Sequence, residues 1–512
     1  MDTTLGTRKV IETCLCVLVA LLVGLFLAAP NSYFALLFLG GVLCLLVSPI
    51  IMRWHRELLL VFWNSSISVF FLPGHPEAWM VLAGLSLGIT ILNRILDGRR
   101  ELKFVPQLSI SLLVLLAVVL VTAQLRGGIG FRALGGDVQG GRKYIYIVAA
   151  VIAFYAVSSV RIPPEKVRFC VSAFFVGYIA LAMSNFAYML GPMFYWLFLF
   201  FPSSYALSQA EAEYMFGQVN RFNGIGVSMT APFFMTIFFW GAAGILEWRK
   251  PWRLGTVILI VAISALGGFR SVLVLFGLVF AMMFWLEGLA KTRWLPMFFL
   301  VAAIGMVALM PVARHLPLVM QRSISFLPLK ISPIAERDAA ASTEWRLKMW
   351  KRLLAEAPHY FWLGKGYALS PTDISMAMES VRRGFFESYE AAIVAGNYHS
   401  GPLSVLIIFG IPGLLAFAVF LWLGWRTLAR NYRHGPVELR VINRFLLACY
   451  LAKVAFYIGI FGDISSDLPF FVGLIGLGIA INGVDPGCTP SLAEKSTLEG
   501  DEQGNSERPL KD

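Results

Sequence analysis

The sequence contains few charged residues. Only 14% of its 512 residues are Asp, Glu, Lys or Arg, whereas about 25% is usual for a soluble domain, and 58% are hydrophobic. The mean hydropathy is +0.74, and a soluble core of this size does not need so much apolar side chain. The scarcity of charge excludes an ordinary soluble protein and predicts an all-α, polytopic integral membrane protein.

The sequence also lacks the spacings that hold metals or build a disulfide framework. Its six cysteines include no CxxC pair, and its six histidines include no HxxxH or HExxH pattern. We therefore expect neither structural disulfides nor a metal site, and we expect no cofactor.

Long apolar runs dominate what remains. We predict about fourteen transmembrane helices (range 12–14), most of them close to the ~20 residues that a helix needs to cross a bilayer. The third run is interrupted by Asn64-Ser65-Ser66, which favours a re-entrant segment there. The predicted spans are 10–29, 33–52, 57–72, 77–93, 105–123, 144–160, 169–190, 224–246, 254–268, 271–289, 294–312, 402–424, 441–461 and 468–482.

Basic residues alternate between the loops. With the amino terminus in the cytoplasm, the inner loops carry 20 Lys and Arg and the short outer loops carry six. Such a bias is typical of cytoplasmic loops, so the formal charge of +12 does not indicate nucleic-acid binding. It predicts a multi-pass protein with both termini in the cytoplasm.

Four regions follow from this topology. We predict a bundle of eleven spans (1–312), a long periplasmic loop (313–401), three further spans (402–483) and a disordered cytoplasmic tail (484–512). A loop as long as the second region is expected to hold its own short helices. Trp345, Met349 and Leu353 recur at helical spacing within it and predict an amphipathic helix on the outer leaflet.

The clearest catalytic candidate is His399, directly before the span that starts at 402. Pro402 in the first turn leaves free helix N–H groups nearby, whose field favours a neutral imidazole that accepts a proton from a hydroxyl. The neighbouring Ser400 is a candidate acceptor contact. The alternative is a loop histidine without a role.

Cationic side chains in unusual positions are candidates for binding a diphosphate. Arg221 and Arg270 lie at outer ends of spans against the positive-inside bias, and a guanidinium matches phosphate oxygens. Lys453 is charged near the middle of a span, where an ionisable group is costly. The alternatives are arginines that snorkel to lipid headgroups and a lysine with a structural partner.

Other polar residues of the outer face are candidate sugar or acceptor contacts. Arg132 lies in a glycine-rich outer loop, and Arg346 lies on the expected amphipathic helix. Asp463 and Asp467 share a short outer loop, where simple solvation is the alternative.

The chain resembles the O-antigen ligase/polymerase superfamily of bacterial membrane glycosyltransferases between Glu344 and about Leu415. After His399 come leucines at the fourth and seventh positions, and a Gly-Ile-Pro-Gly begins at the eleventh. Ser400 stands where the family has asparagine, and Ile408 stands where glutamate is common. Further matching residues are Trp345-Arg346, Trp350, Pro358 and Gly364-Lys365-Gly366.

The resemblance implies metal-independent, inverting transfer of a glycan from an undecaprenyl-diphosphate-linked donor to an acceptor sugar hydroxyl. It also implies that the transfer takes place at the periplasmic face of the bacterial inner membrane. It implies that His399 is the base and that Arg221 and Arg270 bind the diphosphate. The acceptor can be a further lipid-linked repeat, a lipid A core or a protein, and other polysaccharide-assembly proteins are candidate partners. The alternative from another class is a transporter or flippase of lipid-linked sugars, although no internal repeat is visible.

Overall fold

The computed structural model describes residues 33–97, 105–128, 141–214, 219–368, 370–385 and 387–483, with isolated positions between 17 and 24. Within these ranges the chain is helical and has no β-strand beyond an isolated antiparallel bridge between Ser68 and Glu77. The predicted all-α class is confirmed.

The amino-terminal half holds α2 (Tyr33–Phe62), α3 (Ala78–Asp97), α4 (Pro106–Arg126), α5 (Gly141–Ser158), α6 (Pro164–Val176), α7 (Ala182–Leu190), α8 (Ser204–Tyr214), α9 (Asn223–Ser228) and α10 (Thr230–Ile245). The remainder holds α11 (Pro251–Ala265), α12 (Arg270–Leu286), α13 (Trp294–Val312), α14 (Leu318–Ser323), α15 (Pro333–Glu356), α16 (Pro371–Arg382), α17 (Ser388–Val394), α18 (Gly401–His434), α19 (Arg440–Gly459) and α20 (Ile464–Asn482).

Many of these helices are suited to a bilayer. In the part of the chain that the structure describes, nine helices are long and apolar enough to cross a membrane, and α11 and α12 are shorter apolar helices. The protein is therefore a polytopic membrane protein. The predicted count of fourteen spans is not reproduced, and the first predicted span, 10–29, falls almost wholly outside the described residues.

The interruption expected in the third predicted span, 57–72, is present, whereas a re-entrant course of this segment stays a prediction. Helix α2 continues through the predicted loop 53–56, with a kink at Trp54, and ends at Phe62. There the Asn64 side chain donates to the carbonyl of Phe174 (2.6 Å), and Ser66 adopts a φ of +49°. Because these polar residues find partners outside a helix, the chain leaves helical geometry at the interruption.

The bundle is built around α20. Its most apolar stretch is 94% buried inside the protein, whereas that of α13 is 0% buried. Glycines let neighbours approach α20 closely: a methyl group on Gly473 would overlap the Phe174 ring. Helix α20 is thus the centre of the core, and the apolar surface of α13 is left for lipid.

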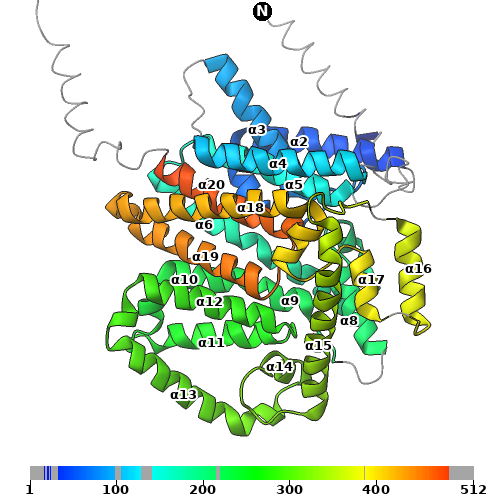
Figure 1. The fold of residues 1–512 in the computed structure, drawn as a ribbon. Helices are drawn as coiled ribbons and strands as arrows, with labels where there is room; N and C mark the ends of the chain where they lie inside the picture. The colour runs from blue at the N-terminus through cyan, green and yellow to red at the C-terminus, as the bar shows by residue number, and fades with distance from the viewer. Residues whose placement is uncertain are drawn as a thin grey trace, which may run out of the picture.

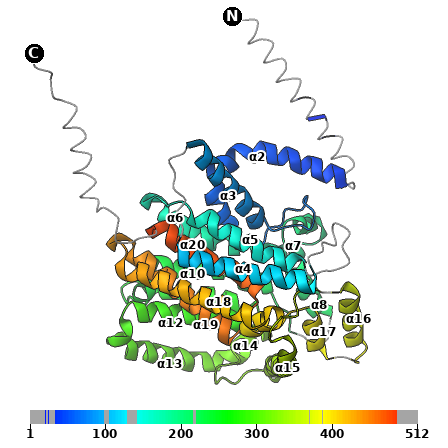
Figure 2. The ribbon, with the colours of Figure 1, turned by 45° about the horizontal axis from the view of Figure 1, so that its top comes forward.

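The helices carry polar clusters at two separate ends. In Figure 1 several long helices run across the view, and α15, α16 and α17 lie across their right-hand ends; Figure 2 shows α16 and α17 at the same end. Lys166 pairs with Glu57 at one end, and Lys143 pairs with Asp463 at the other. Lys166 lies in a predicted inner loop, and Lys143 and Asp463 lie in predicted outer loops, so the two ends agree with the predicted sides of the membrane. That the end with Lys166 faces the cytoplasm stays a prediction.

The segment 313–401 contains α14, α15, α16 and α17, so it holds helices of its own. The stripe expected to rest on the outer leaflet instead packs within the protein. Met349 and Leu353 are fully buried, and Trp345 contacts the ring of His399. Because the stripe has a protein partner, α15 is a packed element of the fold and its apolar face is not free for lipid.

Candidate active site

Helix α15 organises a cluster of arginines. Its Asp338 accepts two hydrogen bonds from Nη2 of Arg221, at 2.9 and 3.1 Å, and also pairs with Nε of Arg322. Arg322 belongs to α14, and its Nη1 donates to the carbonyl of Gly268. One carboxylate therefore joins two cations that come from separate segments of the chain.

Arg270 contacts the same helix one turn further along. It is the first residue of α12, and its Nη2 donates to the carbonyl of Ala339 (2.9 Å) and to Oγ1 of Thr343 (3.0 Å). The tight turn before Arg270 depends on Gly268, because its φ is +70°, a conformation that favours glycine. A side chain at this position would also crowd Arg221. The two predicted arginines thus approach each other through adjacent turns.

Arg346 extends this cluster toward His399. Burial and the charge of Arg322 lower the pKa of Arg346, and burial and Arg322 also lower the pKa of Arg221. Among the described residues, no hydrogen bond or ion pair engages the guanidinium of Arg346. It is a half-buried cation whose donors are available to a ligand.

His399 lies between two aromatic rings at the edge of this cluster. Its ring centroid is 5.2 Å from that of Trp345 and 5.1 Å from that of Phe461. Burial, followed by the charge of Arg346, lowers the pKa of His399 to about 4, so the imidazole is neutral at neutral pH. Its Nδ1 is buried and has no hydrogen-bond partner within the described ranges. A neutral base with an uncommitted nitrogen lies beside an available cation.

The loop that carries His399 is held from both sides. Trp350 donates from Nε1 to the carbonyl of Tyr398 (3.0 Å). On the other side, Nζ of Lys143 donates to the Gly396 carbonyl (2.8 Å) and to Oδ1 of Asn397 (3.1 Å). The φ of His399 is +50°, a left-handed conformation that is uncommon for residues other than glycine. These bonds offset the cost of that conformation and fix the direction of the ring.

Asp463 links this loop to the membrane bundle. Its Oδ2 lies 3.3 Å from Nζ of Lys143, and its Oδ1 caps α20 through the N–H of Ser465 (2.9 Å). Its charge acts to raise the pKa of His399, against the larger effects of burial and Arg346. Asp463 is thus the carboxylate that acts on His399, although the structure records no hydrogen bond between them.

Lys453 and Asp467 lie below this network and not in the arginine cluster. Their side chains form an ion pair of 2.6 Å, and the ammonium also lies over the ring of Phe456 at 5.1 Å. Oδ2 of Asp467 accepts from the backbone N–H of Asp463 (2.8 Å). In this structure Lys453 has the structural partner that was the alternative to a diphosphate contact.

The spacing of glycine and proline after His399 has a backbone explanation. Helix α18 breaks at Gly410 (φ +67°, ψ −169°), and Pro412 has no N–H to donate. The freed carbonyls of Ile407 and Ile408 accept from the N–H groups of Lys365 (2.7 Å) and Gly366 (3.0 Å). The Gly364-Lys365-Gly366 stretch therefore completes the broken helix.

Arg126 secures that stretch to the bundle. Its Nε donates to the Gly364 carbonyl (2.9 Å) and its Nη2 to the Leu363 carbonyl (3.2 Å). Ser400 is the residue before α18, where its carbonyl accepts from Ser404 (2.9 Å). Arg132 lies outside the described residues.

The sequence did not single out Asp338, Arg322 or Lys143. Arg322 and Lys143 are further basic residues of predicted outer loops, and Asp338 is an acid within the predicted loop 313–401 that also holds Arg322. Their importance comes from contacts across the chain, for example the 117 positions between Arg221 and Asp338.

Part of this candidate site lies in a segment that matches a known family. Residues 254–418 match the family described as O-antigen ligase. The match includes Arg270, Arg322, α15 and His399. This segment is similar to the O-antigen ligase family. The predicted resemblance is confirmed, while Arg221 and Asp463 enter the site from outside the O-antigen ligase segment. A comparison with curated proteins finds no match.

Proposed function

We propose that this protein is a membrane glycosyltransferase that transfers a glycan from a lipid-diphosphate-linked donor to an acceptor sugar hydroxyl. The observation that carries the proposal is the grouping against α15 of several arginines beside a half-buried histidine whose imidazole is neutral. The O-antigen ligase segment supports a role in O-antigen or related polysaccharide assembly.

The cationic cluster suits the leaving group. A disubstituted diphosphate carries two negative charges, and a guanidinium donates paired hydrogen bonds to such oxygens. Arg346 has donors available, while Arg221 and Arg270 reach α15 from the membrane bundle. On this proposal these arginines stabilise the negative charge that develops on the departing phosphate oxygen, which is usually the largest catalytic effect.

His399 acts on the other reactant. The acceptor hydroxyl gives its proton to the neutral imidazole while its oxygen bonds to the anomeric carbon. The bond from that carbon to the diphosphate oxygen breaks, its electron pair leaves with the diphosphate, and the anomeric configuration inverts. General-base catalysis of this kind contributes about 10²–10⁴-fold to the rate.

The test uses a host strain that lacks this gene, because the natural lipid-linked donor accumulates where its transferase is missing. The purified protein is incubated with that lipid extract, and product is followed on gels. We expect glycan transfer by the wild type, a loss of about 10²-fold or more in His399→Ala, and near-normal transfer in Arg249→Gln, an exposed control. Full transfer by His399→Ala would exclude the base role, and translocation of the lipid without transfer would favour a transporter.

A further inference from the structure

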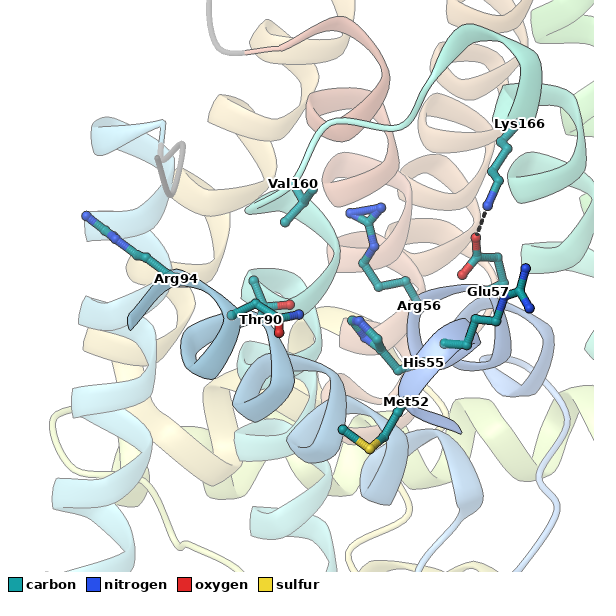
Figure 3. Close-up of a pocket in the computed structure, with 10 residues that line it drawn as sticks. Met52, His55, Arg56, Glu57, Thr90, Arg94, Val160 and Lys166 are labelled. Atoms are coloured by element: carbon teal, nitrogen blue, oxygen red, sulfur yellow. Dashed lines mark hydrogen bonds and ion pairs between the residues drawn. The ribbon is translucent and has the colours of Figure 1, made fainter. Parts of the chain in front are cut away.

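A groove with a volume of about 700 Å³ runs between α4 and α18. These two helices lie side by side in Figures 1 and 2. By contrast, the hollow in Figure 3 does not present its side chains to one ligand, because Arg94 points away from the other labelled residues and Lys166 already donates to Glu57. The walls of the groove between α4 and α18 are formed by Gln107, Ile110, Ser111, Val114, Val118, Pro412, Leu415, Ala416, Val419, Trp422, Leu423 and Arg426.

The groove extends from the middle of the bundle to the end that is predicted to face the cytoplasm. Just beyond it on α18, Asn431 donates to the Gly478 carbonyl of α20 (3.1 Å). Two residues further along α20, a carbonyl accepts from the N–H of Ile162 (2.8 Å), in the turn before α6. Arg426 therefore lies toward that end, whereas Pro412 lies toward the candidate active site.

The length of the groove matches one leaflet of a bilayer. On α4 its lining runs from Gln107 to Val118, which is about 16 Å at the helical rise of ~1.5 Å per residue. On α18 it runs from Pro412 to Arg426, which is about 21 Å. Half of the ~30 Å hydrocarbon core is about 15 Å. A lipid chain whose headgroup stays at the inner surface thus extends along the groove as far as the middle of the bundle.

The polarity of the lining changes from one end of the groove to the other. Its length is bounded by apolar side chains, among which Val114 and Val419 are exposed. The hydroxyl of Ser111 is already satisfied, because it donates to the Leu108 carbonyl (2.8 Å). The amide of Gln107 lies at the same end as the guanidinium of Arg426. An apolar slot with polar donors at one end is complementary to a phospholipid.

The charge of Arg426 determines which phospholipid fits. Its guanidinium lies over the ring of Trp422, 5.3 Å from the ring centroid, so it is held beside the groove. Among the described residues that line the groove, none is a carboxylate that would neutralise this cation. Basic sites between helices on the cytoplasmic side attract anionic headgroups, and a guanidinium donates well to phosphate oxygens.

We infer that the groove between α4 and α18 binds one anionic phospholipid of the inner leaflet, separately from the proposed transfer site. An acyl chain lies between the two helices, and the phosphate lies at Arg426. The far end of the chain reaches Pro412, close to the break of α18 at Gly410. The lipid therefore packs against α18 beside the point where its helical hydrogen bonds are interrupted.

The test measures lipid binding to the purified full-length protein in detergent by native mass spectrometry. Phosphatidylglycerol and phosphatidylcholine with identical acyl chains are titrated separately, and the dissociation constant of the first bound lipid is determined. Val419→Trp fills the groove, and Arg426→Gln removes its cation. The matched controls are Val307→Trp on α13 and Arg433→Gln on α18, which make the same changes at exposed positions outside the groove.

We expect the wild type to bind phosphatidylglycerol more tightly than phosphatidylcholine. Val419→Trp should weaken the binding of phosphatidylglycerol about tenfold or more, and Arg426→Gln should weaken it about fivefold, as the loss of one basic residue at a membrane surface implies. Each control should change it less than about twofold. Arg426→Gln should leave the binding of phosphatidylcholine nearly unchanged, because that headgroup carries no net charge.

Three results would overturn the inference. Equal affinity of the wild type for the two lipids would exclude an anionic occupant. Unchanged binding of phosphatidylglycerol in Val419→Trp would exclude the groove as its site. Equal losses in a site variant and its control would show that only the general lipid layer around the protein had been measured.

Discussion

The lowered pKa of His399 predicts an unusual pH profile for glycan transfer. An imidazole with the ordinary pKa of 6.5 is about 3% neutral at pH 5, whereas one with a pKa of about 4 is about 90% neutral. The free protein should therefore keep about 30-fold more of its plateau activity at pH 5 than an ordinary histidine base would allow. Because only the neutral ring accepts a proton, activity falls as the pH drops through about 4.

The causes of this shift supply a matched pair of variants. Arg346 lowers the pKa of His399, and Asp463 raises it. Arg346→Gln should move the acid limb of kcat/KM to higher pH, and Asp463→Asn should move it to lower pH. The amide of asparagine can still cap α20 through its oxygen, so the second change removes charge more than structure.

The assay follows initial rates of product formation across pH with the purified protein and its lipid-linked donor. Neither a disubstituted diphosphate nor a sugar hydroxyl changes its protonation near neutrality. The acid limb of the pH profile therefore reports the pKa of a group of the protein. The limb of kcat should lie at higher pH than that of kcat/KM, because bound diphosphate favours imidazolium. A wild-type midpoint of kcat/KM near 6.5, or variants that shift in the same direction, would refute this account of the site.

Three further substitutions test other parts of the structure. Lys143→Met removes the bonds to Gly396, Asn397 and Asp463, so kcat should fall about tenfold to a hundredfold with KM nearly unchanged in steady-state kinetics, and Lys143→Arg should recover part of the loss. Gly410→Ala places a side chain at a φ of +67° and close to the Phe361 and Trp362 carbonyls, so thermal unfolding should show a loss of about 2–3 kcal/mol, whereas Gly277→Ala, which meets open space, should be neutral. Asp338→Asn leaves the buried Arg322 without its carboxylate and should cost about 2–4 kcal/mol, and pyrophosphate should raise the unfolding temperature of this variant more than that of the wild type. An equal rise in both proteins would contradict a shared anion site.

The sequence predicts the helices well because lipid leaves the backbone few options. Each N–H and C=O in the bilayer must find a partner within its own helix, so apolar runs such as 105–123 and 294–312 correspond to α4 and α13. The run 57–72 is less regular, because at its polar interruption Asn64 bonds to Phe174, 110 positions away. Hydropathy along the chain cannot register a partner at that distance.

The candidate site was partly visible for a different reason. Arg221 and Arg270 depart from the positive-inside bias, and His399 precedes a helix start, so each is unusual in its local sequence. Asp338 and Arg322, with which these residues form the cluster, do not stand out in their local sequence. Lys453 shows the converse, since a mid-span charge attracted a functional prediction, but Asp467 compensates that charge in the fold.

Most charges of the arginine cluster are already compensated by the protein before a ligand binds. Several cations cannot be half-buried together without compensation, and Asp338 supplies it for Arg221 and Arg322, while Arg270 uses backbone and hydroxyl oxygens of α15. An incoming diphosphate must therefore compete with Asp338 for these two guanidinium groups or bind first where competition is absent. Arg346 meets the second condition, and its charge also acts on His399. On the proposed mechanism, the cation that first receives the donor also adds to the effect of burial in keeping His399 neutral.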